Sequence, residues 1–112
     1  MSPRRLAAAL GLLAAGLAQA TPAASSSAVH LACEPVYLPA RSVWARTVDI
    51  AYDQKKVRSV LIDGVPVYTF SVRGTTILTA LDNERIQIDV AALSWRSDFR
   101  GVASSEGRCE RG

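Results

Sequence analysis

Apolar and polar residues alternate along several short stretches of the chain, and this alternation predicts β-strands. Every second residue is apolar from Thr47 to Tyr52 and again from Arg85 to Val90. Successive side chains of a strand point to opposite faces, so this pattern is typical of strands with one buried face. No stretch after residue 20 repeats its apolar residues with the period of a helix. The pattern predicts a small all-β domain, an antiparallel meander of about six to eight strands that forms a sandwich or a barrel.

The clearest local signal is the pair Asp63-Gly64, which lies between two runs rich in β-branched residues. A type I′ turn needs positive φ at both central positions, and Asp-Gly adopts it readily. The turn predicts a hairpin from Lys56 to Val72 that pairs Ile62 with Val65 beside the turn and residues 57–59 with residues 68–70 farther along. Pro66 cannot donate to a ladder, so this end of the sheet is predicted to be an edge.

The register of this hairpin assigns its side chains to two faces. The face with more large apolar residues is predicted to be core, and it carries Val57, Leu61, Tyr68, Phe70 and Val72. The other face is predicted to be half exposed, and near the turn it carries Val60, Ile62, Val65 and Val67. An apolar patch of this kind is covered either by another segment of the chain or by a partner. It is therefore one candidate partner surface.

A second candidate partner surface follows from the residues between Ser94 and Arg100. An extended chain places Arg96, Asp98 and Arg100 on one face, and arginine is enriched at protein interfaces. The alternative interpretation is an exposed charge ladder of little energetic consequence, with the aromatic residues of this stretch in the core.

The first twenty residues have the pattern of a cleaved signal peptide. A positively charged start precedes an apolar run from Leu6 to Leu17, and Ala18-Gln19-Ala20 provides the small residues of a cleavage site. The run of about 12 residues is too short to span a bilayer as a helix. We therefore expect export to the periplasm or beyond the cell. The expected organisation is a signal peptide over residues 1–20, a flexible segment over residues 21–29 and a single β domain over residues 30–112.

Removal of the signal peptide changes the charge balance. Residues 1–20 hold two of the 13 basic residues and none of the 10 acidic ones, which leaves a formal charge of +1. Nucleic-acid-binding domains concentrate basic residues in a patch or stripe, so no nucleic-acid partner is expected. The sequence does not determine the oligomeric state.

Cys33 and Cys109 are the only two cysteines of the chain. In an oxidising compartment an even number of cysteines predicts a disulfide. This bridge would close a loop of about 77 residues and stabilise the fold by about 4 to 5 kcal/mol in the chain-entropy description. The alternative, lipid attachment at Cys33, requires an aliphatic residue where His30 stands, and it would leave Cys109 unpaired.

The sequence gives little support for catalysis. His30 is the single histidine, and it lies at the expected start of the ordered chain, which disfavours a Ser-His catalyst. Its spacing with Cys33 does not complete a zinc site, and no glycine-rich phosphate loop occurs. No catalytic, metal-binding or cofactor-binding residue is therefore assigned. A small hydrolase is kept as an alternative.

The chain resembles the periplasmic inhibitors of c-type lysozyme, which are small secreted barrels of comparable size. The resemblance rests on the signal peptide, the length, the strand content and a disulfide from the first strand to a terminal Gly107-Arg108-Cys109. These inhibitors insert a Ser-Gly-x-x-Tyr loop into the lysozyme cleft, but this chain contains no such run, so no functional residue is carried over. The expected function is that of an exported, non-enzymatic binding protein of the bacterial envelope. Inhibition of a lysozyme-like hydrolase is the alternative.

Overall fold

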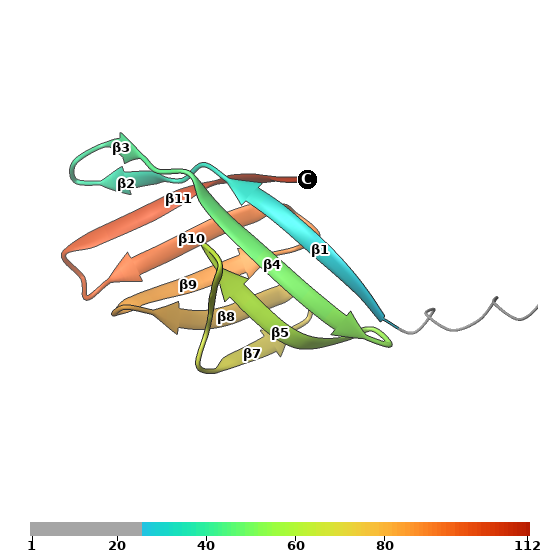
Figure 1. Cartoon of the computed structure of the whole chain (residues 1–112). Helices are drawn as coiled ribbons and strands as arrows, with labels where there is room; N and C mark the ends of the chain where they lie inside the picture. Colours follow the sequence, from blue (N-terminus) through green and yellow to red (C-terminus); the bar gives the residue numbers. More distant parts are fainter. Residues whose placement is uncertain (1–25) are drawn as a thin grey trace, which may run out of the picture.

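The described chain consists of strands joined by tight turns, so the predicted all-β class is confirmed (Figure 1). The structure is a computed structural model, and it describes residues 26–112. Its strands are β1 (Ser26–Cys33), β2 (Val36–Leu38), β3 (Ser42–Val43), β4 (Arg46–Asp53), β5 (Lys56–Ile62), β6 (Val65–Pro66), β7 (Phe70–Arg73), β8 (Thr76–Leu81), β9 (Glu84–Asp89), β10 (Ser94–Phe99) and β11 (Ala103–Arg111). The number exceeds the expected six to eight because four of these strands have only two to four residues.

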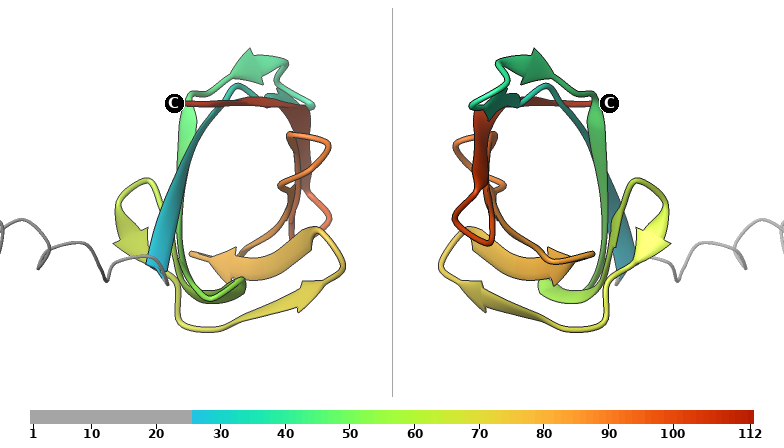
Figure 2. Two further views of the ribbon diagram at one scale, coloured as in Figure 1. Left: turned by 90° about the vertical axis from the view of Figure 1, so that its right-hand side faces the viewer. Right: turned by 90° about the vertical axis from the view of Figure 1, so that its left-hand side faces the viewer.

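All strands belong to one antiparallel sheet that curls into a half-barrel (Figure 2). The order across the sheet is β6-β5-β4-β1-β11-β10-β9-β8-β7, and the short β2–β3 hairpin is attached to β11. β6 and β7 follow each other in the chain, yet they form the two opposite edges of the sheet. The edge predicted from Pro66 is therefore present, since Pro66 lies in the edge strand β6.

The disulfide lies where the two halves of the sheet meet. β1 pairs with β4 along its whole length, but it pairs with β11 at only three positions. One of these positions is Cys33 opposite Cys109, and the two residues form the predicted disulfide. β6, β5, β4 and β1 lie on one side of this junction, and the strands from β11 to β7 lie on the other. The bridge therefore joins the two halves of the half-barrel.

The ordered chain begins earlier than expected. β1 starts at Ser26, although residues 21–29 were predicted to be a flexible segment. Residues 26–29 pair with Ile50, Ala51, Tyr52 and Asp53 of β4. The backbone ladder orders this low-complexity stretch, because main-chain hydrogen bonds do not depend on large side chains. Residues 1–25, which include the predicted signal peptide and its cleavage site, lie outside the described residues.

The predicted turn at Asp63-Gly64 is confirmed, but the hairpin is much shorter than expected. Both residues have positive φ, 53° and 82°, and Ile62 pairs with Val65 as predicted. The last contact of this hairpin is a hydrogen bond from the Val67 amide to the Val60 carbonyl. The chain then leaves β5 and crosses to the other edge of the sheet, where β7 pairs with β8. The predicted pairing of residues 57–59 with residues 68–70 is therefore wrong.

The assignment of the two hairpin faces is also wrong. Val60 and Ile62, predicted to be half exposed, are 2% and 0% exposed, whereas Tyr68 is 98% exposed. The core lies inside the curled sheet, and Val60 and Ile62 of β5 belong to it. Val57 and Phe70 are partly buried at its margin, and Val72 is exposed.

The core consists of aliphatic side chains from both halves of the sheet together with one tryptophan and the disulfide. Its buried members are Leu31, Cys33, Val48, Ile50, Val60, Ile62, Ile77, Ile86, Ile88, Trp95 and Cys109. The two alternating stretches that predicted strands at residues 47–52 and 85–90 contribute four of them. Phe99, also expected in the core, is 38% exposed because it lies at the far end of β10.

Candidate functional site

A cavity of about 530 Å³ lies at the end of the half-barrel that carries the β2–β3 hairpin. Four segments of the chain form its walls: the β2–β4 connection, the β5–β6 turn, the β8–β9 turn and the β10–β11 turn. Its lining residues are Tyr37, Leu38, Pro39, Ala40, Ser42, Trp44, Ala45, Arg46, Asp63, Asp82, Glu84, Phe99 and Ala103. A volume of this size is typical of small-molecule sites.

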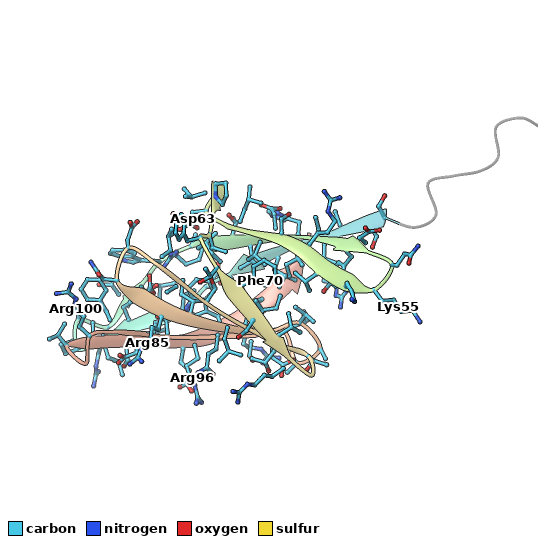
Figure 3. The ribbon with its side chains drawn as sticks, turned by 90° about the horizontal axis from the view of Figure 1, so that it is seen from below. Lys55, Asp63, Phe70, Arg85, Arg96 and Arg100 are labelled. Carbon is cyan, nitrogen blue, oxygen red and sulfur yellow. A yellow bond between two sulfur atoms is a disulfide. The ribbon has the colours of Figure 1, made fainter. Side chains whose placement is uncertain are left out.

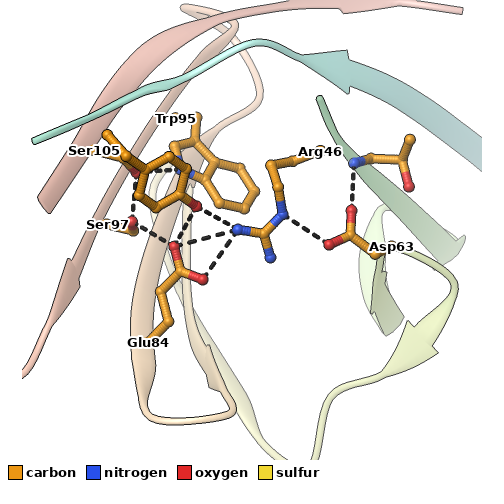
Figure 4. Close-up of polar contacts among 8 residues, drawn as sticks. Arg46, Asp63, Glu84, Trp95, Ser97 and Ser105 are labelled. Atoms are coloured by element: carbon orange, nitrogen blue, oxygen red, sulfur yellow. Dashed lines mark hydrogen bonds and ion pairs between the residues drawn. The ribbon is translucent and has the colours of Figure 1, made fainter. Parts of the chain in front are cut away.

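Arg46, the first residue of β4, forms the floor of this cavity. Only 8% of it is exposed, and two carboxylates hold its guanidinium (Figure 4). Nε donates a hydrogen bond to Asp63 Oδ2 at 2.7 Å, and Nη1 donates to Glu84 Oε1 at 3.0 Å. Asp63 Oδ1 also accepts the Thr47 amide at 2.9 Å. The turn residue Asp63 therefore fixes Arg46 as well as the end of β5.

Glu84 connects Arg46 to a row of buried hydroxyl groups. Its Oε2 accepts hydrogen bonds from the Tyr37 hydroxyl at 2.5 Å and from the Ser97 hydroxyl at 2.6 Å. The Ser97 and Ser105 hydroxyls lie 2.5 Å apart, and the Trp95 indole donates to Ser105 Oγ at 2.9 Å. The row therefore runs from the core tryptophan to the cavity floor (Figure 4). Such a connected network of hydrogen bonds holds its members in one arrangement.

The network also fixes the protonation of two groups. Burial lowers the pKa of Arg46, but its hydrogen bonds with Glu84 and Asp63 outweigh burial, so the pKa is raised overall. Burial and the hydrogen bond to Glu84 raise the pKa of Tyr37. Arg46 is therefore a permanent cation and Tyr37 a neutral hydroxyl at every physiological pH.

One nitrogen of Arg46 is left without a partner. Within residues 26–112, no group accepts a hydrogen bond from Nη2, which points into the space between Glu84 and Asp63 (Figure 4). Every fully buried polar side-chain atom in this part of the chain has a partner, so Nη2 is within reach of solvent. The cavity therefore presents two N–H donors on a rigidly held cation.

Aromatic and apolar side chains form the walls above this floor. Trp44 is 57% exposed, and its ring centroid lies 5.1 Å from that of Tyr37. Leu38 and Phe99 are also exposed at the rim. The Arg46 guanidinium lies 4.8 Å from the centroid of the buried Trp95 ring, a cation–π contact that helps to orient it. Exposed aromatic side chains around a charged group are typical of binding sites.

The residues of the two predicted partner surfaces lie elsewhere. Val60 and Ile62 are core residues, so the chain itself covers that face. Val65 is exposed in the edge strand β6, and Val67 is partly buried against the core. Figure 3 shows Arg96 and Arg100 at separate places on the surface. Arg96 forms an exposed ion pair with Glu106 at 2.8 Å.

The single histidine also pairs with a carboxylate. His30 Nδ1 lies 2.6 Å from Asp49 Oδ1 on neighbouring strands β1 and β4. Ser59 of β5 lines the same shallow depression, but in the described chain it makes no hydrogen bond with His30. A catalytic triad needs the nucleophile within hydrogen-bond reach of the base. The His30–Asp49 pair is therefore an outer-face contact of the sheet.

Sequence reasoning missed Arg46 and Glu84, although the alternation contained a signal for both. Arg46 continues the buried positions Val48 and Ile50 backward by one step, and Glu84 precedes Ile86 in the same way. A charged residue at an inward position requires a buried partner. An inward arginine on one strand and an inward glutamate on another therefore indicate a buried ion pair. This signal is visible only when the alternation is followed to the first residue of each strand.

Comparisons with known proteins provide no relative: no protein-family model, curated protein or solved structure matches the chain. Among residues 26–112, no helix is long and apolar enough to cross a membrane. The same residues contain no group of three histidine, cysteine, aspartate or glutamate side chains placed to hold a metal ion.

Proposed function

We propose that the protein is an exported, non-enzymatic binding protein of the bacterial envelope, and that it holds its partner in the cavity above Arg46. The observation that carries this proposal is the unpartnered Nη2 of a nearly buried arginine that lines a cavity with exposed aromatic walls. Binding sites combine apolar walls with a few fixed polar groups that select and orient the ligand.

The hydrogen bonds of the site favour binding over chemistry. Both oxygens of Asp63 and both oxygens of Glu84 accept hydrogen bonds from the protein itself. A general base needs a lone pair directed at its substrate. These carboxylates instead hold Arg46 in position, so the polar groups of the floor serve to shape the site.

Export is tested by the mass of the protein recovered from its own cell. We expect the protein in the periplasm or medium, with Thr21 as its first residue, because Ala18 and Ala20 suit signal peptidase. Intact-mass spectrometry of cell fractions measures this directly. Ala20→Arg should block cleavage and leave the precursor. A wild-type protein that begins at Met1 in the cytoplasm would contradict export.

Binding through the cavity is tested with isolated cell envelopes and matched aromatic variants. We expect Trp44→Ala to weaken co-sedimentation with envelopes about tenfold or more, because exposed aromatic residues carry a large share of binding energy. Tyr68→Ala is the control, since Tyr68 is 98% exposed and lies outside the cavity. Binding of Trp44→Ala at the wild-type level would remove the cavity from the proposal.

A further inference from the structure

We infer that the ligand is an N-acetylated amino sugar of a neutral glycan chain, bound by its acetamido group to Arg46. This inference rests on the proposed binding function and adds the chemistry of the ligand. It follows from three properties of the cavity: the donor that it leaves free, the sign of its charge and the flat apolar surface at its rim.

The free donor requires an acceptor oxygen. Nη2 of Arg46 lies at the floor, and the rest of the guanidinium is held by Asp63 and Glu84. Its direction is therefore fixed before a ligand arrives. A ligand that supplies an oxygen at this point pairs a donor whose position the protein has already fixed, which makes the contact selective.

The charge of the cavity excludes an anionic acceptor. Arg46 is the one cation among the lining residues, whereas Asp63, Asp82 and Glu84 are three carboxylates. A phosphate or carboxylate ligand would meet net repulsion, since complementary potentials are needed across an interface. A basic peptide would suit the carboxylates but would bring a cation to Arg46. A neutral carbonyl oxygen satisfies both conditions.

The remaining groups suit the rest of an acetamido sugar. Asp82 is exposed in the β8–β9 turn with φ 51° and lines the cavity, so its carboxylate can accept from a sugar hydroxyl or the acetamido N–H. Trp44 offers a flat apolar face to the C–H groups of the ring, and Phe99 and Leu38 offer apolar contacts to the methyl group. A sugar ring of this type presents an acceptor, several donors and an apolar face together.

The test uses triacetylchitotriose, the β-1,4-linked trimer of N-acetylglucosamine, and cellotriose, which has the same rings and linkage without the acetamido groups. Isothermal titration calorimetry of the full mature protein measures binding, because its signal does not depend on Trp44 and the same readout therefore serves the wild type and every variant. We expect saturable binding of triacetylchitotriose, and at least about tenfold weaker binding of cellotriose.

The variants Trp44→Ala and Asp82→Asn should each weaken the binding of triacetylchitotriose by about tenfold. Asparagine tolerates the positive φ at position 82, so the fold is kept. Tyr68→Ala should bind as the wild type does.

Three results would overturn the inference: no saturable binding of triacetylchitotriose by folded protein at millimolar sugar, equal binding of cellotriose, or preferred binding of an oligolysine peptide. The proposed function is judged separately by envelope co-sedimentation. If the sugar fails to bind but Trp44→Ala still releases the protein from envelopes, the cavity remains the binding site and its ligand is of another class.

Discussion

Replacing Val60 with aspartate is expected to unfold the protein, whereas the same change at Val65 leaves it folded. Val60 is 2% exposed on the concave side of β5, and Val65 is 46% exposed in the edge strand β6. Val60→Asp removes buried apolar surface and places a carboxylate without a partner among aliphatic side chains. The cost is more than about 4 kcal/mol, a large part of the total stability of a domain this small. Val65→Asp exchanges one exposed side chain for another and costs less than about 1 kcal/mol.

Urea unfolding followed by far-UV circular dichroism measures both variants. The two residues belong to the same hairpin and lay on the same predicted face, so Val65→Asp is a close control for the substitution itself. If Val60→Asp unfolded at the wild-type urea midpoint, the concave side of the half-barrel would not be the core. If both variants unfolded together in buffer, the edge position of Val65 would be wrong.

The difference in burial between Val60 and Val65 shows which features of this fold the local sequence pattern predicts and which it does not. The turn at Asp63-Gly64 is predictable because its φ values depend on the two residues themselves. The buried face of β5 depends on distant strands, since the half-barrel must close over Val60 and Ile62. Counting apolar residues across a long hairpin assigned the core to the wrong face, because Tyr68 and Val72 belong to a segment that has left β5.

The candidate site was less predictable than the fold for the same reason. The polar network at its floor comes from β2, β4, β9, β10, β11 and the β5–β6 turn. Its charged members Arg46, Asp63 and Glu84 are far apart in sequence, with 17 residues from Arg46 to Asp63 and 38 from Arg46 to Glu84. A motif scan detects residues at fixed spacing, and this network has none. What the sequence does contain is the inward position of Arg46 and Glu84 at the ends of two alternating strands. Leu38 and Trp44 at the rim of the cavity come from the segment that joins β2 to β4.

Removing the disulfide is expected to lower the free energy of unfolding by about 4 to 5 kcal/mol in the double variant Cys33→Ser/Cys109→Ser. The bridge joins residues 76 apart in sequence, and a loop of that length restricts the unfolded chain strongly. The loss of stability is also expected because the bridge lies at the junction between the two halves of the sheet. β1 and β11 pair at only three positions, and they are the only connection between the two halves of the sheet in the described strand order. The covalent bond therefore holds a junction with few backbone hydrogen bonds.

This effect is measured by urea unfolding of the double variant beside the oxidised wild type, with Trp95 fluorescence as the probe of the core. Wild type with a reducing agent is the matched control, and it should unfold at the midpoint of the double variant. A loss below about 1 kcal/mol would show that the ladder between β1 and β11 holds the halves without the bridge.

The double variant should also lose ligand binding, because of where the bridge lies in this topology. Because Arg46 and Asp63 lie in one half and Glu84 in the other, weakening the junction should also loosen the Arg46–Glu84 pair. Ligand binding at the cavity should then decrease in the double variant before the protein unfolds, while Val65→Asp, equally folded and with its bridge intact, retains it.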